Sequence, residues 1–127
     1  MEKMFTLKPA DTLLELNGKT YKMEFNMLAL AKAEQVCEQR FFEQLDTMQI
    51  IAGLVQNKTR AIMALAYGAL TSAGEKVTWE RFTKEMFTFD NFEAIASAVA
   101  DGVAAMFDTD EEDPEASEKN AASRGAN

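Results

Sequence analysis

The chain has 127 residues, of which 47% are hydrophobic and 27% are charged, so it holds material for one domain of ordinary size. Its 13 basic and 21 acidic side chains give a formal charge of −8, which argues against nonspecific binding to a nucleic acid backbone. The sequence has one cysteine and no histidine, which excludes an intramolecular disulfide, histidine-based catalytic triads and histidine-based metal sites.

No basic start followed by an apolar run indicates a signal peptide, and no stretch approaches the roughly 20 apolar residues that cross a bilayer. We therefore expect a soluble cytoplasmic protein without membrane contact. Acidic charge is concentrated at the end of the chain, where residues 108–127 hold seven acids, two bases and no large apolar side chain. We expect these residues to form a disordered acidic tail and residues 1–107 to form a single folded domain.

A β-hairpin is predicted near the start of the chain. Asn17-Gly18 tolerates the positive φ angles of a type I′ turn, so the apolar segments on either side should pair through a two-residue loop. Residues 4–7 are a candidate third strand that Pro9 ends. The predicted register pairs Leu16 with Lys19, Leu14 with Tyr21 and Thr12 with Met23, and places Leu14, Tyr21, Met23 and Phe25 on one dry face.

After the hairpin, apolar residues recur at helical spacing. Asn26 is predicted to cap a helix over residues 27–40, whose apolar stripe we expect to lie against the dry face of the sheet. A shorter helix is predicted over 45–56, and Thr59 should cap the helix that follows it. The inward stripe of the first helix consists of Ala29, Leu30, Ala33, Val36 and Cys37.

The segment 61–70 carries no charge on any face. A helix that is apolar all round either forms the centre of the core or is half covered by another subunit, and the sequence leaves both interpretations open. The second interpretation makes the chain a homo-oligomer, associated through this helix or through the alanine-rich last helix.

Two more helices complete the predicted fold. Thr78 should cap a short helix from residue 79 to about 87, and Asp90 with Glu93 should form a capping box for a last helix that ends near Phe107. Gly102 and the alanines of that helix permit close approach by a neighbouring helix. The predicted class is α+β, with a small N-terminal antiparallel hairpin or sheet packed on a bundle of four to five helices.

Enzymatic chemistry has little support in the sequence. Without histidine, a hydrolase would need paired carboxylates or an activated Lys, Cys or Ser, but the acids of the body fall singly on polar faces or at helix starts. Cys37 lies on an inward stripe, where a small buried hydrophobe is the simpler interpretation. We expect a non-enzymatic protein with no catalytic, cofactor-binding or metal-binding residues.

Large apolar side chains are more abundant than so small a domain can fully bury. Seven methionines besides the initiator suit a deformable surface that holds varied apolar partners, together with six phenylalanines: Phe41, Phe42, Phe82, Phe87, Phe89 and Phe92. The candidate partner-binding residues are Met63, Tyr67, Met86, Phe87, Phe89 and Phe92.

Five short segments in fixed order and spacing carry a resemblance to a known family. They are Leu14-Glu15-Leu16-Asn17-Gly18-Lys19, the strand 21–25, a helix with Ala29-Leu30 and Ala33-Glu34, Ala66-Tyr67-Gly68-Ala69-Leu70, and Val77-Thr78-Trp79-Glu80. Their order resembles that of the tail assembly chaperones of long-tailed bacteriophages and related prophages, and the resemblance covers about residues 10–107.

The resemblance implies a role rather than a site, because this family has no catalytic residues. Its members bind the long, largely helical tape-measure protein in the host cytoplasm and keep it soluble until tail-tube subunits polymerise around it. The implied partners are the tape-measure protein and the tail-tube protein, and the chaperone is absent from the virion. The family commonly makes a longer product by a −1 frameshift, and Glu118-Lys119-Asn120 is compatible with a slippery codon run.

Two other functions stay open. One is an acidic inhibitor that mimics DNA and blocks a host nucleic-acid-binding protein, although most of the net negative charge lies in residues 108–127 rather than along a rigid surface. The other is a structural tail or connector subunit, which would remain in the virion.

Overall fold

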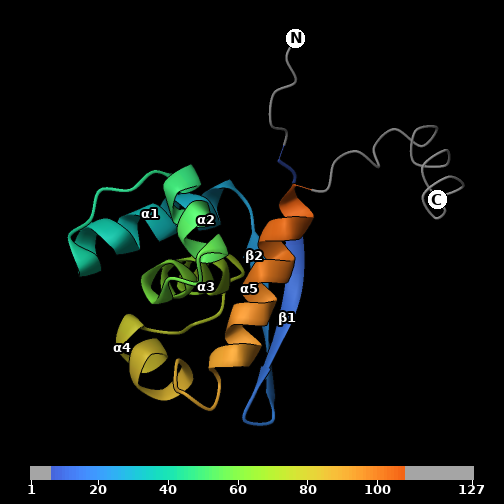
Figure 1. Cartoon of the computed structure of the whole chain (residues 1–127). Coiled ribbons are helices and arrows are strands. Elements are labelled where there is room, and N and C mark those ends of the chain that lie inside the picture. The colour runs from blue at the N-terminus through green and yellow to red at the C-terminus, as the bar shows by residue number, and fades with distance from the viewer. Residues whose placement is uncertain (1–6, 108–127) are drawn as a thin grey trace, which may run out of the picture.

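The computed structural model describes residues 7–107. The first elements are two antiparallel strands that form one sheet, β1 (Ala10–Leu16) and β2 (Lys19–Phe25), as Figure 1 shows. The predicted α+β class is confirmed. The acidic segment 108–127 and most of the candidate third strand over 4–7 lie outside the described residues. The helices are α1 (Met27–Phe41), α2 (Thr47–Val55), α3 (Thr59–Ser72), α4 (Trp79–Arg81) and α5 (Phe92–Met106), with a π-helical turn, η1 (Phe82–Met86), after α4.

The hairpin has the predicted register. Asn17 and Gly18 adopt φ angles of 54° and 79°, which a type I′ turn requires of both its central residues. Leu14 pairs with Tyr21, and both side chains are buried on the dry face. The local turn chemistry therefore decides which face of the sheet meets the helices.

The dry face is covered by α3 and α5 rather than by α1. Helix α5 packs along β1 and α3 packs against β2, whereas α1 packs mainly on α3. Figure 1 shows α5 running alongside the strands. The prediction that the first helix lies on the sheet was wrong, because helical spacing identifies a buried face without identifying what covers it. The predicted stripe itself is buried: Ala29, Leu30, Ala33, Val36 and Cys37.

Helix α3 forms the centre of the core. Gly68 permits its close crossing with α1, since a Cβ atom at this position would lie 2.5 Å from the carbonyl oxygen of Ala29. The structure thus places this apolar helix inside its own domain, where it offers little surface to another subunit. Its buried residues are Ala61, Ile62, Ala64, Leu65, Ala66, Gly68, Ala69 and Leu70.

Gly102 in α5 also marks a close contact, but with the sheet. A Cβ atom at Gly102 would lie 2.2 Å from Cε1 of the Phe25 ring. The neighbour that approaches Gly102 itself is therefore an aromatic side chain of β2, while the helix that packs on α5 is α3. No helix within residues 7–107 is long and apolar enough to cross a membrane.

Two of the predicted helix caps form. Asn26 Oδ1 accepts a hydrogen bond from the Ala29 N–H at 2.9 Å, and Thr78 Oγ1 accepts one from the Arg81 N–H at 3.0 Å. Thr59 does not cap α3, because it is the first helical residue and Lys58 occupies the N-cap position.

Helix α2 begins directly after an N-cap residue, Asp46, that was not among the predicted caps. The side chain of Asp46 accepts from the Gln49 N–H at 2.8 Å, and the Gln49 side chain accepts from the Asp46 N–H at 2.9 Å. This reciprocal capping box sets the start of the helix at Thr47.

The predicted capping box of Asp90 and Glu93 does not form. Asn91 occupies the N-cap position of α5, and its Nδ2 group donates to the carbonyl oxygen of Met86 at 2.9 Å. The start of α5 is thus tied to the end of η1, a π-helical turn that the spacing of this segment does not reveal.

Replacing Asn26 by alanine should lower the free energy of unfolding by about 1–2 kcal/mol. The same oxygen also accepts a hydrogen bond from the Ser72 hydroxyl at 2.8 Å. Removing the Asn26 side chain therefore removes one hydrogen bond at the start of α1 and one at the end of α3. Urea unfolding measures the change, with Asn26→Asp as the control that keeps the acceptor. Equal stability of Asn26→Ala and the wild type would contradict the assigned cap.

Candidate functional site

A row of aromatic rings crosses the molecule from α1 to the start of α5. Successive ring centroids lie 5.2–5.9 Å apart in tilted or edge-to-face arrangements, which suit the ring quadrupoles. The guanidinium of Arg40 lies 5.6 Å from the Trp79 ring centroid, where a cation–π contact forms. The row consists, in order, of Phe41, Trp79, Tyr67, Phe82, Phe87 and Phe92.

One end of this row opens into an apolar groove of about 620 Å³, lined by Thr59, Phe87, Thr88, Phe89 and Phe92. We call it the phenylalanine groove. The Phe89 side chain is fully exposed, whereas Phe87 and Phe92 are half-buried. The groove therefore has a fixed aromatic wall and one ring that is free to contact a partner.

Three of the six predicted partner-binding residues line this groove: Phe87, Phe89 and Phe92. Met86 is only 2% exposed and lies in the core, so its interpretation as a partner-facing residue does not fit the structure. Met63 and Tyr67 are half-buried on α3, where the Tyr67 ring contacts Trp79 and Phe82. Sequence proximity placed Met86 with the phenylalanines, but the turn of η1 directs it inward.

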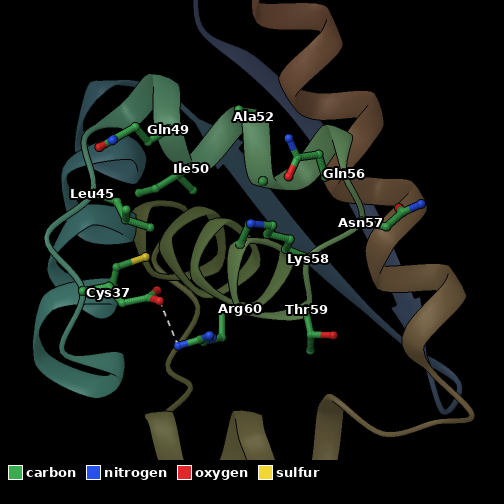
Figure 2. A pocket seen from close by; sticks show the side chains of 13 residues that line it. Cys37, Leu45, Gln49, Ile50, Ala52, Gln56, Asn57, Lys58, Thr59 and Arg60 are labelled. Carbon is green, nitrogen blue, oxygen red and sulfur yellow. Dashed lines mark ion pairs between the residues drawn. The ribbon is translucent and has the colours of Figure 1, made fainter.

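A second depression, the polar groove, lies between α1, α2 and the start of α3 (Figure 2) and has a volume of about 710 Å³. Arg60 Nη1 forms an ion pair with Glu43 Oε2 at 3.0 Å on its wall. Thr59 lines both depressions, so the two grooves adjoin across the first turn of α3. The remaining lining includes Gln49, Gln56, Asn57 and Lys58 as polar groups and Leu45, Ile50 and Ala61 as apolar ones.

Cys37 lines the polar groove, but its thiol is not activated. Burial raises the pKa of the Cys37 thiol, and the Glu43 carboxylate raises it further against the opposing effect of Arg60. A raised pKa reduces the thiolate fraction at neutral pH, and the thiolate is the reactive form. Among residues 7–107, no cluster of His, Cys, Asp or Glu is placed to hold a metal ion.

Exposed apolar side chains also occur away from the phenylalanine groove. Phe42 is 87% exposed because it ends α1 in the left-handed region with φ 57°, which turns the chain away from the core. No sequence signal marks this conformation for a phenylalanine. The other exposed residues of this kind in the described chain are Leu13, Met27, Leu28, Met48 and Val55.

No protein-family model, curated protein or solved structure matches this chain. A functional assignment therefore depends on the surface features above and on the resemblance in the order of the motifs.

Proposed function

We propose that this protein is a non-enzymatic assembly chaperone of the phage-tail type. It binds the tape-measure protein and keeps it soluble in the host cytoplasm until tail-tube subunits polymerise around it. The observation that carries the proposal is the fully exposed Phe89 beside the phenylalanine groove. Covering one phenylalanine side chain contributes about 1.5–3 kcal/mol to a complex, so this surface favours an apolar partner.

A helical client suits this groove. An amphipathic helix presents apolar side chains at helical spacing along one stripe, and such anchors bind in hydrophobic grooves. The half-buried rings of Phe87 and Phe92 are held by the aromatic row, so the groove is largely formed before the client arrives. The chain's net charge of −8 would also limit association between loaded complexes.

Co-expression with the tape-measure protein of the same genome tests the role directly. We expect the soluble yield of the tape-measure protein to rise and a complex to appear on gel filtration. Unchanged solubility together with no complex would contradict the proposal. Mass spectrometry of purified virions separates this role from that of a structural tail subunit, which would remain in the particle.

Replacing Phe89 by serine should abolish most of that gain in soluble yield. Because the side chain is already fully exposed, the free energy of unfolding should change by less than about 0.5 kcal/mol. Phe42→Ser is the matched control, since Phe42 is also exposed but does not line the groove. If both variants lowered the soluble yield of the tape-measure protein equally, the effect would come from general surface hydrophobicity and not from the groove.

A further inference from the structure

The two edges of the hairpin sheet differ. In an antiparallel pair closed by a two-residue turn, the residues flanking the turn exchange hydrogen bonds, and hydrogen-bonded pairs then alternate with non-hydrogen-bonded pairs. Leu16 and Lys19 flank the turn here, so Asp11, Leu13 and Glu15 occupy non-hydrogen-bonded positions. Their backbone N–H and C=O groups point away from β2, along the outer edge of β1.

The corresponding edge of β2 is blocked by a side chain. The Lys22 N–H, which points outward at the centre of that edge, donates to Glu75 Oε2 at 2.8 Å. Within residues 7–107 no group forms such a bond with Leu13 at the centre of the β1 edge. Figure 1 shows β1 at the margin of the fold. Within the described residues, the backbone at the centre of the β1 edge is therefore unpaired, whereas the N–H at the centre of the β2 edge is already bonded.

The side chains of β1 define the chemistry of this edge. On the solvated face, Leu13 is 68% exposed and lies between two carboxylates, Asp11 and Glu15. Glu15 accepts a hydrogen bond from the Thr20 hydroxyl at 3.2 Å. On the dry face, the buried Oγ1 of Thr12 has no hydrogen-bond partner. This oxygen is not accessible at the surface, so the side chains of the solvated face decide which added strand the edge prefers.

We propose that the outer edge of β1 binds an extended, basic segment of another protein as a third antiparallel strand. The segment carries an apolar side chain opposite Leu13 and basic side chains opposite Asp11 and Glu15. Its backbone pairs with the unpaired groups of β1, and its side chains form the cross-strand contacts that stabilise sheets. This interaction depends neither on the phenylalanine groove nor on the proposed client.

A second copy of this chain fits the edge poorly. Antiparallel pairing of two β1 strands about Leu13 would place Asp11 of each copy opposite Glu15 of the other. Like charges directly opposite each other destabilise a sheet, and this pairing would contain two such contacts. The acidic pair therefore selects a basic strand over self-association.

The probe is the peptide acetyl-Thr-Lys-Val-Val-Thr-Lys-Thr-amide, titrated into the full ¹⁵N-labelled chain. In antiparallel register its lysines lie opposite Glu15 and Asp11, and its central valine lies opposite Leu13. We expect NMR shift changes concentrated on the β1 amides and slower hydrogen exchange at Leu13. A peptide with glutamate in place of both lysines should bind about tenfold more weakly.

Leu13→Pro is the decisive variant. Proline removes the outward N–H at the centre of the edge without removing a hydrogen bond of the hairpin, because Leu13 and Lys22 form a non-hydrogen-bonded pair. We expect peptide binding to be lost while the circular dichroism spectrum is unchanged. Leu13→Thr, which keeps the N–H, is the matched control and should still bind.

If Leu13→Pro fails to fold, the double variant Asp11→Lys, Glu15→Lys tests the proposal with the backbone unaltered. It should reverse the preference so that the glutamate peptide binds more tightly. Equal binding of both peptides, no binding, or shift changes confined to other elements would overturn the proposal. So would a wild-type dimer that Leu13→Pro dissociates, or binding seen only after removal of residues 1–6, since the edge would then be occupied by the chain itself.

Discussion

Replacing Phe82 by alanine is expected to lower the free energy of unfolding by about 3–5 kcal/mol. The Phe82 side chain has no exposed surface, and its ring contacts those of Tyr67, Trp79 and Phe87 at centroid distances of 5.6–5.9 Å. Truncation would remove the ring that joins α3 to the segment before α5. The loss therefore combines the lost burial of an aromatic side chain with the cavity left among rings that cannot all collapse.

Urea unfolding followed by far-ultraviolet circular dichroism measures this effect. Phe82→Leu is the control, because it retains most of the apolar volume and should destabilise by only about 1–1.5 kcal/mol. Trp79 is the chain's only tryptophan and lies 5.9 Å from Phe82, so its fluorescence reports local repacking in either variant. An alanine variant as stable as the leucine variant would contradict the expected cost of the cavity, because both variants lack the ring and differ mainly in the apolar volume left unfilled.

The aromatic row, anchored by the buried Phe82, also explains why the phenylalanine groove can stay open. Phe87 contacts Phe82 on one side and Phe92 on the other, both at 5.7 Å, so the groove wall is anchored in the core. Phe89 lies beyond the row and has no such anchor. An apolar groove whose rings all moved freely would tend to close on itself, whereas an anchored wall keeps apolar surface available to a partner.

The hairpin was predictable because its determinants are local. Asn17 and Gly18 specify the turn, the turn specifies the register, and the register specifies the face of every side chain in both strands. The exposure of Leu13 follows from the same register, since it lies opposite Lys22 on the solvated face. The local sequence thus predicts both the fold of the hairpin and which residues lie at its open edge.

The packing of the helices was less predictable because its determinants are distant. The stripe of α1 is the predicted one, but α1 lies on α3 since Gly68 allows the two backbones to approach. The start of α5 depends on the hydrogen bond between the Asn91 side chain and Met86, which only exists once η1 has formed. The capping box that the Asp90 and Glu93 pair predicts locally does not form, because this tertiary contact sets the start of the helix instead.

The candidate site was likewise predictable only where its determinants are local. Its aromatic composition was evident from the segment 86–92, and Phe87, Phe89 and Phe92 do line the groove. Thr59, which also lines the groove, comes from the first turn of α3, and no local pattern reveals that this turn lies beside the phenylalanines. Met86 illustrates the reverse case, in which a residue with the right composition and spacing is buried by the turn that contains it.

Replacing Gly68 by alanine is expected to lower the free energy of unfolding by about 2 kcal/mol, although alanine is the better helix former by about 1 kcal/mol. The added Cβ atom would lie 2.5 Å from the carbonyl oxygen of Ala29 and 3.2 Å from the amide nitrogen of Ala33. Both atoms belong to the backbone of α1. They can yield only if the whole helix moves away from α3, which would open the core between the two.

Second-site variants separate this backbone clash from ordinary overpacking. Ala29→Gly should not rescue Gly68→Ala, because the atom in contact is a carbonyl oxygen that every residue carries. Gly102→Ala provides the contrast, since its added Cβ meets the Phe25 ring, and Phe25→Leu should recover part of the stability lost there. Chemical denaturation of the four variants and two doubles measures these couplings. Rescue by Ala29→Gly, or a stabilised Gly68→Ala, would show that α1 and α3 cross at a greater distance.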